Sequence, residues 1–323
     1  MHPLPSHLRP MSMLDLLDGV FWTYRKGFLT FLGVVVLALL PFILIETVLS
    51  GYIQYGTFSD LIRAPISRSG FPFFSANMIL AYAALFGVSL IQSIIVQPVM
   101  YGAIIWATAQ RTQGVPISIR GAYGFGTRSM LSLIGASFLV LLITLVMVGV
   151  PYGIMVGALL YLTRISDSGE ATALVIGVVI TALILLLLAL IALLLLTVKF
   201  LFVPQAIVLE TTGPLNAFSR SWGLTRGSFW RVLAILLLVA LVVVFLTFAI
   251  GMVNAFITVA AMFTAGTENP TLAAIAQAVS TLLNSIPTMV LFPIYGIGST
   301  LLYYDLRLRK EGADLQARLE SSA

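Results

Sequence analysis

The chain contains no cysteine and only two histidines, His2 and His7, and few of its residues carry a charge. The absence of cysteine excludes disulfides, thiolate metal sites and cysteine nucleophiles. Serine and threonine are scattered without a Ser/His/Asp set, and no metal-binding or phosphate-loop spacing is present. The sequence therefore predicts no cofactor, no metal and no catalytic residues, and a protein that is not an enzyme.

The low charge content also excludes an ordinary soluble domain. Only 9% of the 323 residues are charged, against about a quarter in soluble proteins, while 60% are hydrophobic and the mean hydropathy is +1.08. We predict an all-α polytopic membrane protein, because six apolar segments reach the roughly 20 residues that a bilayer-spanning helix needs. These segments are 27–49, 77–109, 131–163, 172–204, 229–263 and 271–304, with candidate kinks at Pro98, Pro151, Pro204, Pro287 and Pro293.

The distribution of positive charge predicts the orientation. Fourteen of the seventeen Lys and Arg residues fall on one side of the predicted spans, and only Arg63, Arg68 and Arg164 fall on the other. Because positive residues near span ends stay in the cytoplasm, both termini should be cytoplasmic in a multi-pass protein of the cell (inner or plasma) membrane. The basic residues that give the net charge of +5 lie beside the predicted spans. We therefore expect anionic membrane lipid and no nucleic acid as the partner.

The segments repeat three times as a short interfacial helix, a span, an outer connection and a return span. The repeats cover 11–110, 115–204 and 213–304 within a single membrane domain, 1–323, which ends in a charged cytoplasmic tail, 305–323. The first outer connection is predicted to be a long loop from Ser50 to Ala76. A shift of 200 residues places Trp22, Lys26 and Gly27 on Trp222, Arg226 and Gly227.

The predicted interfacial helices have an apolar and a basic face. In the helix that begins at Pro214, Leu215, Phe218 and Trp222 share one face, and Arg220 takes the other. In the first helix, an apolar stripe of Met13, Leu17, Val20 and Tyr24 follows a possible capping box of Ser12 and Asp15. Such helices lie in the membrane interface, where cations meet lipid phosphate. The predicted headgroup contacts are Arg220, Trp222, Arg226, Arg231, Lys26, Trp22 and Arg128.

Polar residues inside the spans are candidates for a second site. Lys199 could pair with Glu210 in a functional intramembrane site, or it could extend its amine to the headgroups. Four amides either line a polar path or hydrogen-bond between helices: Gln92, Gln97, Asn254 and Asn284. Gly149, Gly153 and Gly157 form a small-residue ridge that favours close helix packing.

Two stretches resemble a known family. The segments 203–210, 213–217 and 220–233, which include Glu210, Arg220 and Trp222, together with the ending 303–315, are similar to the signature of the glycerophosphoryl diester phosphodiesterase membrane-domain family. The resemblance implies a six-helix membrane domain of largely unassigned activity, which some relatives fuse to a phosphodiesterase. That enzyme needs a barrel of about 250 residues, and this chain has no soluble stretch of that length.

Three functions are consistent with these features. The first is a non-catalytic module that organises lipids or partner proteins at the cytoplasmic leaflet. The second is a transporter or channel for a lipid or small solute, and the third is an intramembrane enzyme. A cavity lined by the four amides would favour transport, whereas a Leu-filled centre would favour the module. The sequence does not determine the ligand, the protein partner or the oligomeric state.

Overall fold

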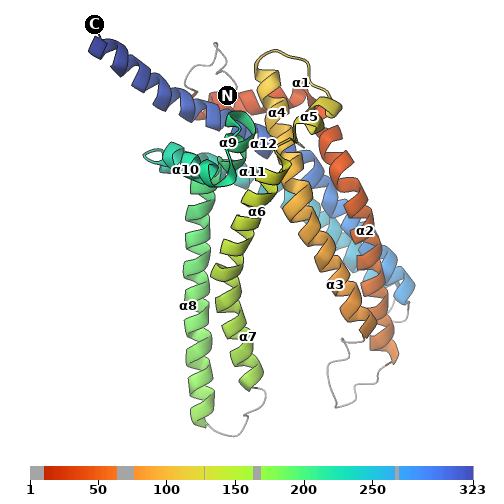
Figure 1. The fold of residues 1–323 in the computed structure, drawn as a ribbon. Helices are drawn as coiled ribbons and strands as arrows, with labels where there is room; N and C mark the ends of the chain where they lie inside the picture. Colours follow the sequence, from red (N-terminus) through yellow and green to blue (C-terminus); the bar gives the residue numbers. More distant parts are fainter. Residues whose placement is uncertain (1–10, 64–75, 127, 163–168, 266–268, 323) are drawn as a thin grey trace.

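The computed structural model describes residues 11–63, 76–126, 128–162, 169–265 and 269–322. Within these ranges the regular structure is helical (Figure 1), and six segments are long and apolar enough to cross a membrane. The predicted all-α fold with six spans is confirmed. The spans are 28–57, 76–112, 130–158, 176–210, 229–256 and 270–312.

The first short helix and hairpin comprise α1 (Met13–Lys26), α2 (Phe28–Arg63), α3 (Ala76–Ile91), the π-turn η1 (Gln92–Val96) and α4 (Gln97–Thr112). The helix α1 begins at the predicted capping box, since the Asp15 amide donates to Ser12 Oγ at 3.1 Å and the Ser12 amide donates to Asp15 Oδ2 at 3.0 Å. The reciprocal bonds satisfy two amides that a helix start leaves without partners.

The prediction of an outer loop from Ser50 is wrong in its first half. The helix α2 continues without interruption to Arg63, because the apolar and aromatic residues after Ser50 contain no helix-breaking proline. The remaining predicted loop residues, 64–75, lie outside the described residues.

The second unit comprises α5 (Ile119–Gly126), α6 (Met130–Thr144), the π-turn η2 (Leu145–Gly149), α7 (Val150–Leu162) and α8 (Gly169–Phe200). Each π-helical turn ends two residues before a predicted kink site, η1 before Pro98 and η2 before Pro151. Proline removes a backbone donor and its ring collides with the preceding turn, so a locally widened helix accommodates it.

The third unit comprises α9 (Val203–Glu210), α10 (Pro214–Thr225), α11 (Phe229–Ala265) and α12 (Pro270–Ser322). Gly227 joins α10 to α11 with a φ of 81°, a left-handed conformation that glycine adopts without strain. Pro204 lies in the first turn of α9, while Pro287 and Pro293 remain inside α12.

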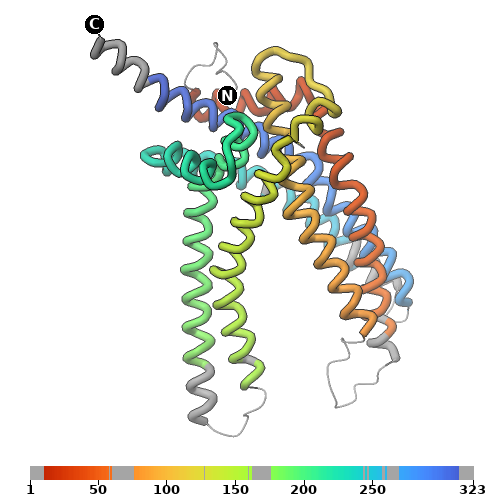
Figure 2. The backbone as a smooth tube through the Cα atoms, in the orientation of Figure 1, coloured from red at the N-terminus to blue at the C-terminus, as the bar shows by residue number. Residues whose placement is uncertain are grey.

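The short helices α1, α5 and α10 gather at one end of the molecule, here called the basic end (Figure 1). The main core also lies at this end, where α12 packs against α1, α2, α4 and α11. Its fully buried side chains include Leu16, Phe31, Ile104, Ile207 and Tyr303. Away from the basic end, the α6–α8 hairpin diverges from the other spans (Figure 2), and much of the span surface is exposed.

Close helix contacts do not occur at the predicted glycine ridge. Nothing lies within 4 Å of a Cβ placed at Gly153 or Gly157, so these two positions face open space in the single chain. One close approach between helix backbones is instead at Gly126 in α5, where a Cβ would lie 3.1 Å from the Val99 carbonyl oxygen. The ridge prediction is wrong for packing within the bundle, because α7 turns these glycines away from its neighbours.

Candidate functional site

Helix α10 is amphipathic, and two of its large apolar residues face outward. Leu215 is 74% exposed and Trp222 is 48% exposed, whereas Ala217, Ser221 and Leu224 are buried against the protein. The orientation is reasonable in a membrane, where the surroundings of the bundle are themselves apolar. Leu215 and Trp222 of the predicted apolar face therefore point away from the bundle, the side on which an interfacial helix meets the membrane, while Phe218 is half-buried with its ring 4.8 Å from that of Phe200.

The buried face of α1 also differs in part from the predicted apolar stripe. Val20 and Tyr24 are buried as expected, while Met13 is 41% exposed and Leu16 is fully buried in place of Leu17. Burial raises the pKa of the Tyr24 hydroxyl, which donates to the Val290 carbonyl oxygen of α12 at 2.9 Å. The short helix is thus fixed to the last span by a specific contact.

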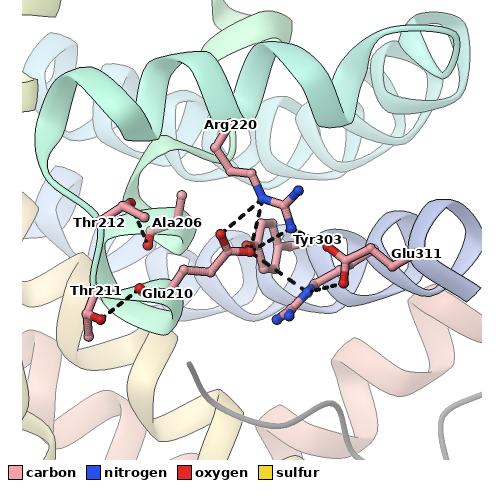
Figure 3. A network of polar contacts seen from close by, with 8 residues as sticks. Ala206, Glu210, Thr211, Thr212, Arg220, Tyr303 and Glu311 are labelled. Atoms are coloured by element: carbon pink, nitrogen blue, oxygen red, sulfur yellow. Dashed lines mark hydrogen bonds and ion pairs between the residues drawn. The ribbon is translucent and has the colours of Figure 1, made fainter. Parts of the chain in front are cut away.

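An ion-pair network joins α9, α10 and α12 at the basic end (Figure 3). The Glu210 side chain is 3% exposed, and Arg220 donates to its two carboxylate oxygens at 2.9–3.1 Å. Tyr303 also donates to Glu210, and Glu311 accepts from Arg220. Arg307 completes the network, with Nε 2.7 Å from Glu311 and 3.8 Å from Glu210. Two arginines and two carboxylates therefore compensate one another where water is scarce.

The electrostatics of Arg220 agree with this geometry. Partial burial alone would lower its pKa, but the hydrogen bonds to Glu210 and Glu311 outweigh burial and raise the pKa above its ordinary value. A guanidinium matched to a carboxylate by parallel hydrogen bonds is held in one orientation. Arg220 thus fastens α10 onto α9 and α12.

A second network lies on the same stretch of α12, at Asp305 and Arg309. Asp305 is fully buried, and its carboxylate is 3.0 Å from both Arg231 and Arg309. The Met11 amide donates to Asp305 at 2.8 Å, and the Met11 carbonyl oxygen accepts from Arg231 and Arg309 at 2.6 and 2.9 Å. The start of the predicted charged tail is accordingly part of the packed core and binds the chain ahead of α1.

These networks change the roles of three predicted site residues. Arg220 and Arg231 hold carboxylates of α9 and α12, so their main contacts are structural. The predicted pairing of Lys199 with Glu210 is not formed, because Arg220 occupies that carboxylate. Lys199 instead places its amine 5.0 Å from the Trp222 ring centre and 5.6 Å from that of Phe229.

The other predicted headgroup contacts remain on the surface. Lys26 lies over the Trp22 ring at 4.0 Å, and Trp22 is 56% exposed. Arg128 and Arg226 are exposed at the corresponding places in the second and third units. Among the described residues, no carboxylate lies within ion-pair distance of these three cations. The three are available to anions outside the chain.

The cavities of the bundle are apolar. One of about 440 Å³ lies between α8, α11 and α12, and another of about 420 Å³ lies between η1, α4, α6, α9 and α12. Of the four predicted amides, only Gln97 lines either of them. Gln92 and Asn254 are half-buried elsewhere, and Asn284 is exposed. The structure does not bring the amides together into one polar path.

A buried polar triad escaped the sequence prediction. Tyr101 of α4 and Ser299 of α12 are 2.6 Å apart, and the Gln205 amide nitrogen donates to both, at 3.2 and 2.9 Å. All three side chains are buried, and Tyr101 also borders the 420 Å³ cavity. Their separation of roughly a hundred residues along the chain gave no local signal for the contact.

A comparison with known protein families finds one family whose model matches most of the chain. The model of the family described as "Domain of unknown function (DUF7847)" matches residues 26–303, which include all three hairpins and the Glu210 network as far as Tyr303. The chain belongs to the DUF7847 family. No curated protein and no solved structure matches it. The family match includes Glu210, Arg220, Arg231 and Tyr303 but ends before Asp305, and its description gives no activity.

Proposed function

We propose that this DUF7847 protein is a non-catalytic membrane module that gathers anionic lipids at the cytoplasmic leaflet. The supporting observation is an exposed cation at the junction between each short helix and the span that follows it. Lys26 ends α1 just before α2, Arg128 lies between α5 and α6, and Arg226 lies between α10 and α11. The exposed rings of Trp22 and Trp222 belong at the same depth, because tryptophan favours the headgroup region.

The magnitude of the attraction supports a measurable preference. A basic residue near an anionic surface contributes about 1 kcal/mol, so three such residues contribute about 3 kcal/mol at low salt. The paired arginines 220, 231 and 307 contribute less to lipid attraction, since carboxylates of the protein already neutralise them. The exposed cations therefore carry the proposal.

The test replaces Lys26, Arg128 and Arg226 together by glutamine and extracts the protein in polymer nanodiscs with its surrounding lipid. Mass spectrometry should find the ratio of phosphatidylglycerol to phosphatidylethanolamine several-fold closer to that of the bulk membrane than for the wild type. The matched control replaces the three cations assigned to the opposite side, Arg63, Arg68 and Arg164. Equal lipid ratios in the wild type and the first variant would overturn the proposal.

The orientation is part of the same proposal. The basic end should face the cytoplasm, because the excess of Lys and Arg lies there. A phosphatase reporter fused after Ala323 should be inactive, and a cytoplasmic fluorescent reporter at the same position should be active. The reverse result would place the basic end outside the cell.

Lipid transport is a second candidate, favoured by the apolar cavities between the hairpins. A cavity lined by leucine, phenylalanine and proline suits an acyl chain better than a hydrated solute. Reconstituted protein should then speed the exchange of a fluorescent lipid between leaflets. Exchange at the rate of protein-free vesicles would exclude lipid transport and would leave the non-catalytic module as the proposed function.

We also propose a structural relationship to the glycerophosphoryl diester phosphodiesterase membrane-domain family. The two stretches that carry the resemblance are about ninety residues apart, yet they meet through Glu210, Arg220 and Tyr303. An experimental structure of a member of that family should contain the same acid–arginine–tyrosine contact. A member of that family whose corresponding residues do not contact one another would contradict the proposed relationship.

A further inference from the structure

The described cations include a cluster that the networks leave uncompensated. Lys199 ends α8, Arg226 follows α10, and Lys310 lies on the cytoplasmic extension of α12. The Lys310 amine is partly buried and is repelled by the positive charges of Lys199, Arg220 and Arg226. No carboxylate within the described part of the chain forms an ion pair with Lys199, Arg226 or Lys310.

The protein itself brings these like charges together. The Lys310 amine donates to the carbonyl oxygens of Gly223 and Arg226 at 2.8 and 2.5 Å, which caps the end of α10. Lys199 is held beneath α10 by the Trp222 and Phe229 rings, and the Ser221 hydroxyl donates to the Lys199 carbonyl oxygen at 2.6 Å. Converging like charges destabilise a surface unless an anion shares it.

An apolar cavity begins about one helical turn below this cluster. The cavity of about 440 Å³ is lined by Leu194 and Thr197 of α8, Leu233 and Leu237 of α11, and Leu291 of α12. Thr197 is two residues before Lys199, and Leu233 is one turn after Phe229, which is about 5 Å along a helix. A cationic site at the interface thus continues into a slot within the hydrocarbon layer.

We propose that this place binds one anionic phospholipid, with its phosphate against Lys199 and Arg226 and one acyl chain in the cavity between α8, α11 and α12. This inference rests on the proposed function, because it specifies one binding site for the anionic lipids that the protein is proposed to gather. Charge selects the headgroup, because an amine and a guanidinium satisfy a phosphate oxygen where a zwitterion brings its own cation. The cavity falls in the usual size range of ligand sites and excludes polar occupants by its lining.

The test measures single-lipid binding by native mass spectrometry, with dioleoyl phosphatidylglycerol and dioleoyl phosphatidylcholine as probes. The first phosphatidylglycerol should bind the wild-type protein more tightly than phosphatidylcholine. Lys199→Met should weaken phosphatidylglycerol about fivefold, the factor that corresponds to ~1 kcal/mol for one lysine near the interface, and leave phosphatidylcholine unchanged. Lys199→Arg should restore the wild-type affinity, which a purely structural role for the lysine would not require.

A second variant tests the acyl-chain half of the site. Ala240 lines the cavity, so Ala240→Phe should narrow it and weaken both lipids to a similar extent. Wild-type affinity in both Lys199→Met and Ala240→Phe overturns the site, and so does a failure of Lys199→Arg to restore binding. If the variants bind normally while the Lys26, Arg128 and Arg226 variant still loses anionic lipid, the site fails and the proposed function stands.

Discussion

Replacing Glu210 by glutamine should loosen the basic end more than any neutral contact would. The carboxylate is almost fully buried and receives three hydrogen-bond contacts from Arg220 and one from Tyr303. Glutamine keeps the shape but removes the charge, so Arg220 and Arg307 retain only Glu311 as a counter-ion within the network. The surplus positive charge then lies between α9, α10 and α12.

The expected loss follows from the exposure of the partners. Removing one member of a buried ion pair costs about 3–5 kcal/mol, and a hydrogen bond to a charged group contributes about 1.5–3 kcal/mol. Arg220 is 32% exposed, so water screens part of its charge and the lower range applies. We expect Glu210→Gln to lower the unfolding free energy by about 2–3 kcal/mol, against about 0.6 kcal/mol for a typical neutral contact between membrane helices.

The assay is reversible unfolding in mixed micelles by added dodecyl sulfate, followed by the fluorescence of the four tryptophans. The matched control is Glu46→Gln, since Glu46 of α2 is half-buried and forms no ion pair among the described residues. A double-mutant cycle of Glu210→Gln and Arg220→Gln should give a coupling free energy of about 1–3 kcal/mol between the two residues. A loss no larger than that of Glu46→Gln, or a coupling near zero, would refute the reasoning.

Three further predictions concern the contacts that hold the short helices. Gly126→Ala should destabilise by about 1–3 kcal/mol in the same assay, because its Cβ would press on an α4 carbonyl oxygen, while Gly124→Ala, with open space around it, should be neutral or stabilising. Ser12→Ala should cost α1 about 1 kcal/mol and return the pKa of Asp15 toward its ordinary value, which the Ser12 hydrogen bonds now hold lower. The contribution of Asp15 is therefore complete above its ordinary pKa and is lost as the pH falls through the lowered value; an NMR titration that finds an ordinary pKa in the wild type contradicts this. Asp305→Asn should speed proteolysis ahead of α1, because the buried carboxylate binds the Met11 amide; an unchanged cleavage rate would contradict that role.

The sequence predicted well what depends on local pattern and composition. Hydropathy located the six spans, and the Ser12 and Asp15 pair marked the start of α1. It failed for the glycine ridge and for the first outer loop. Gly153 and Gly157 face open space although their spacing favoured close packing, and α2 continues past Ser50 to Arg63.

The partners of the charged side chains depended on tertiary contacts. Glu210 could pair with Lys199 or with Arg220 by proximity in the sequence, and only the packing of α10 over α9 decides for Arg220. Arg307 and Glu311 look like a solvated helix end, yet Arg307 lies 3.8 Å from Glu210 and Glu311 accepts from Arg220, because α12 crosses the basic end. Contacts across roughly ninety residues carry no periodic signal.

The most direct measurement is an electron cryomicroscopy map of the protein in nanodiscs that contain phosphatidylglycerol and phosphatidylethanolamine. We predict α1, α5 and α10 at headgroup depth on one side, with phosphate density against Lys26, Arg128 and Arg226. A map in which α10 lies in the hydrocarbon layer, or in which lipid phosphates avoid all three cations, would contradict it.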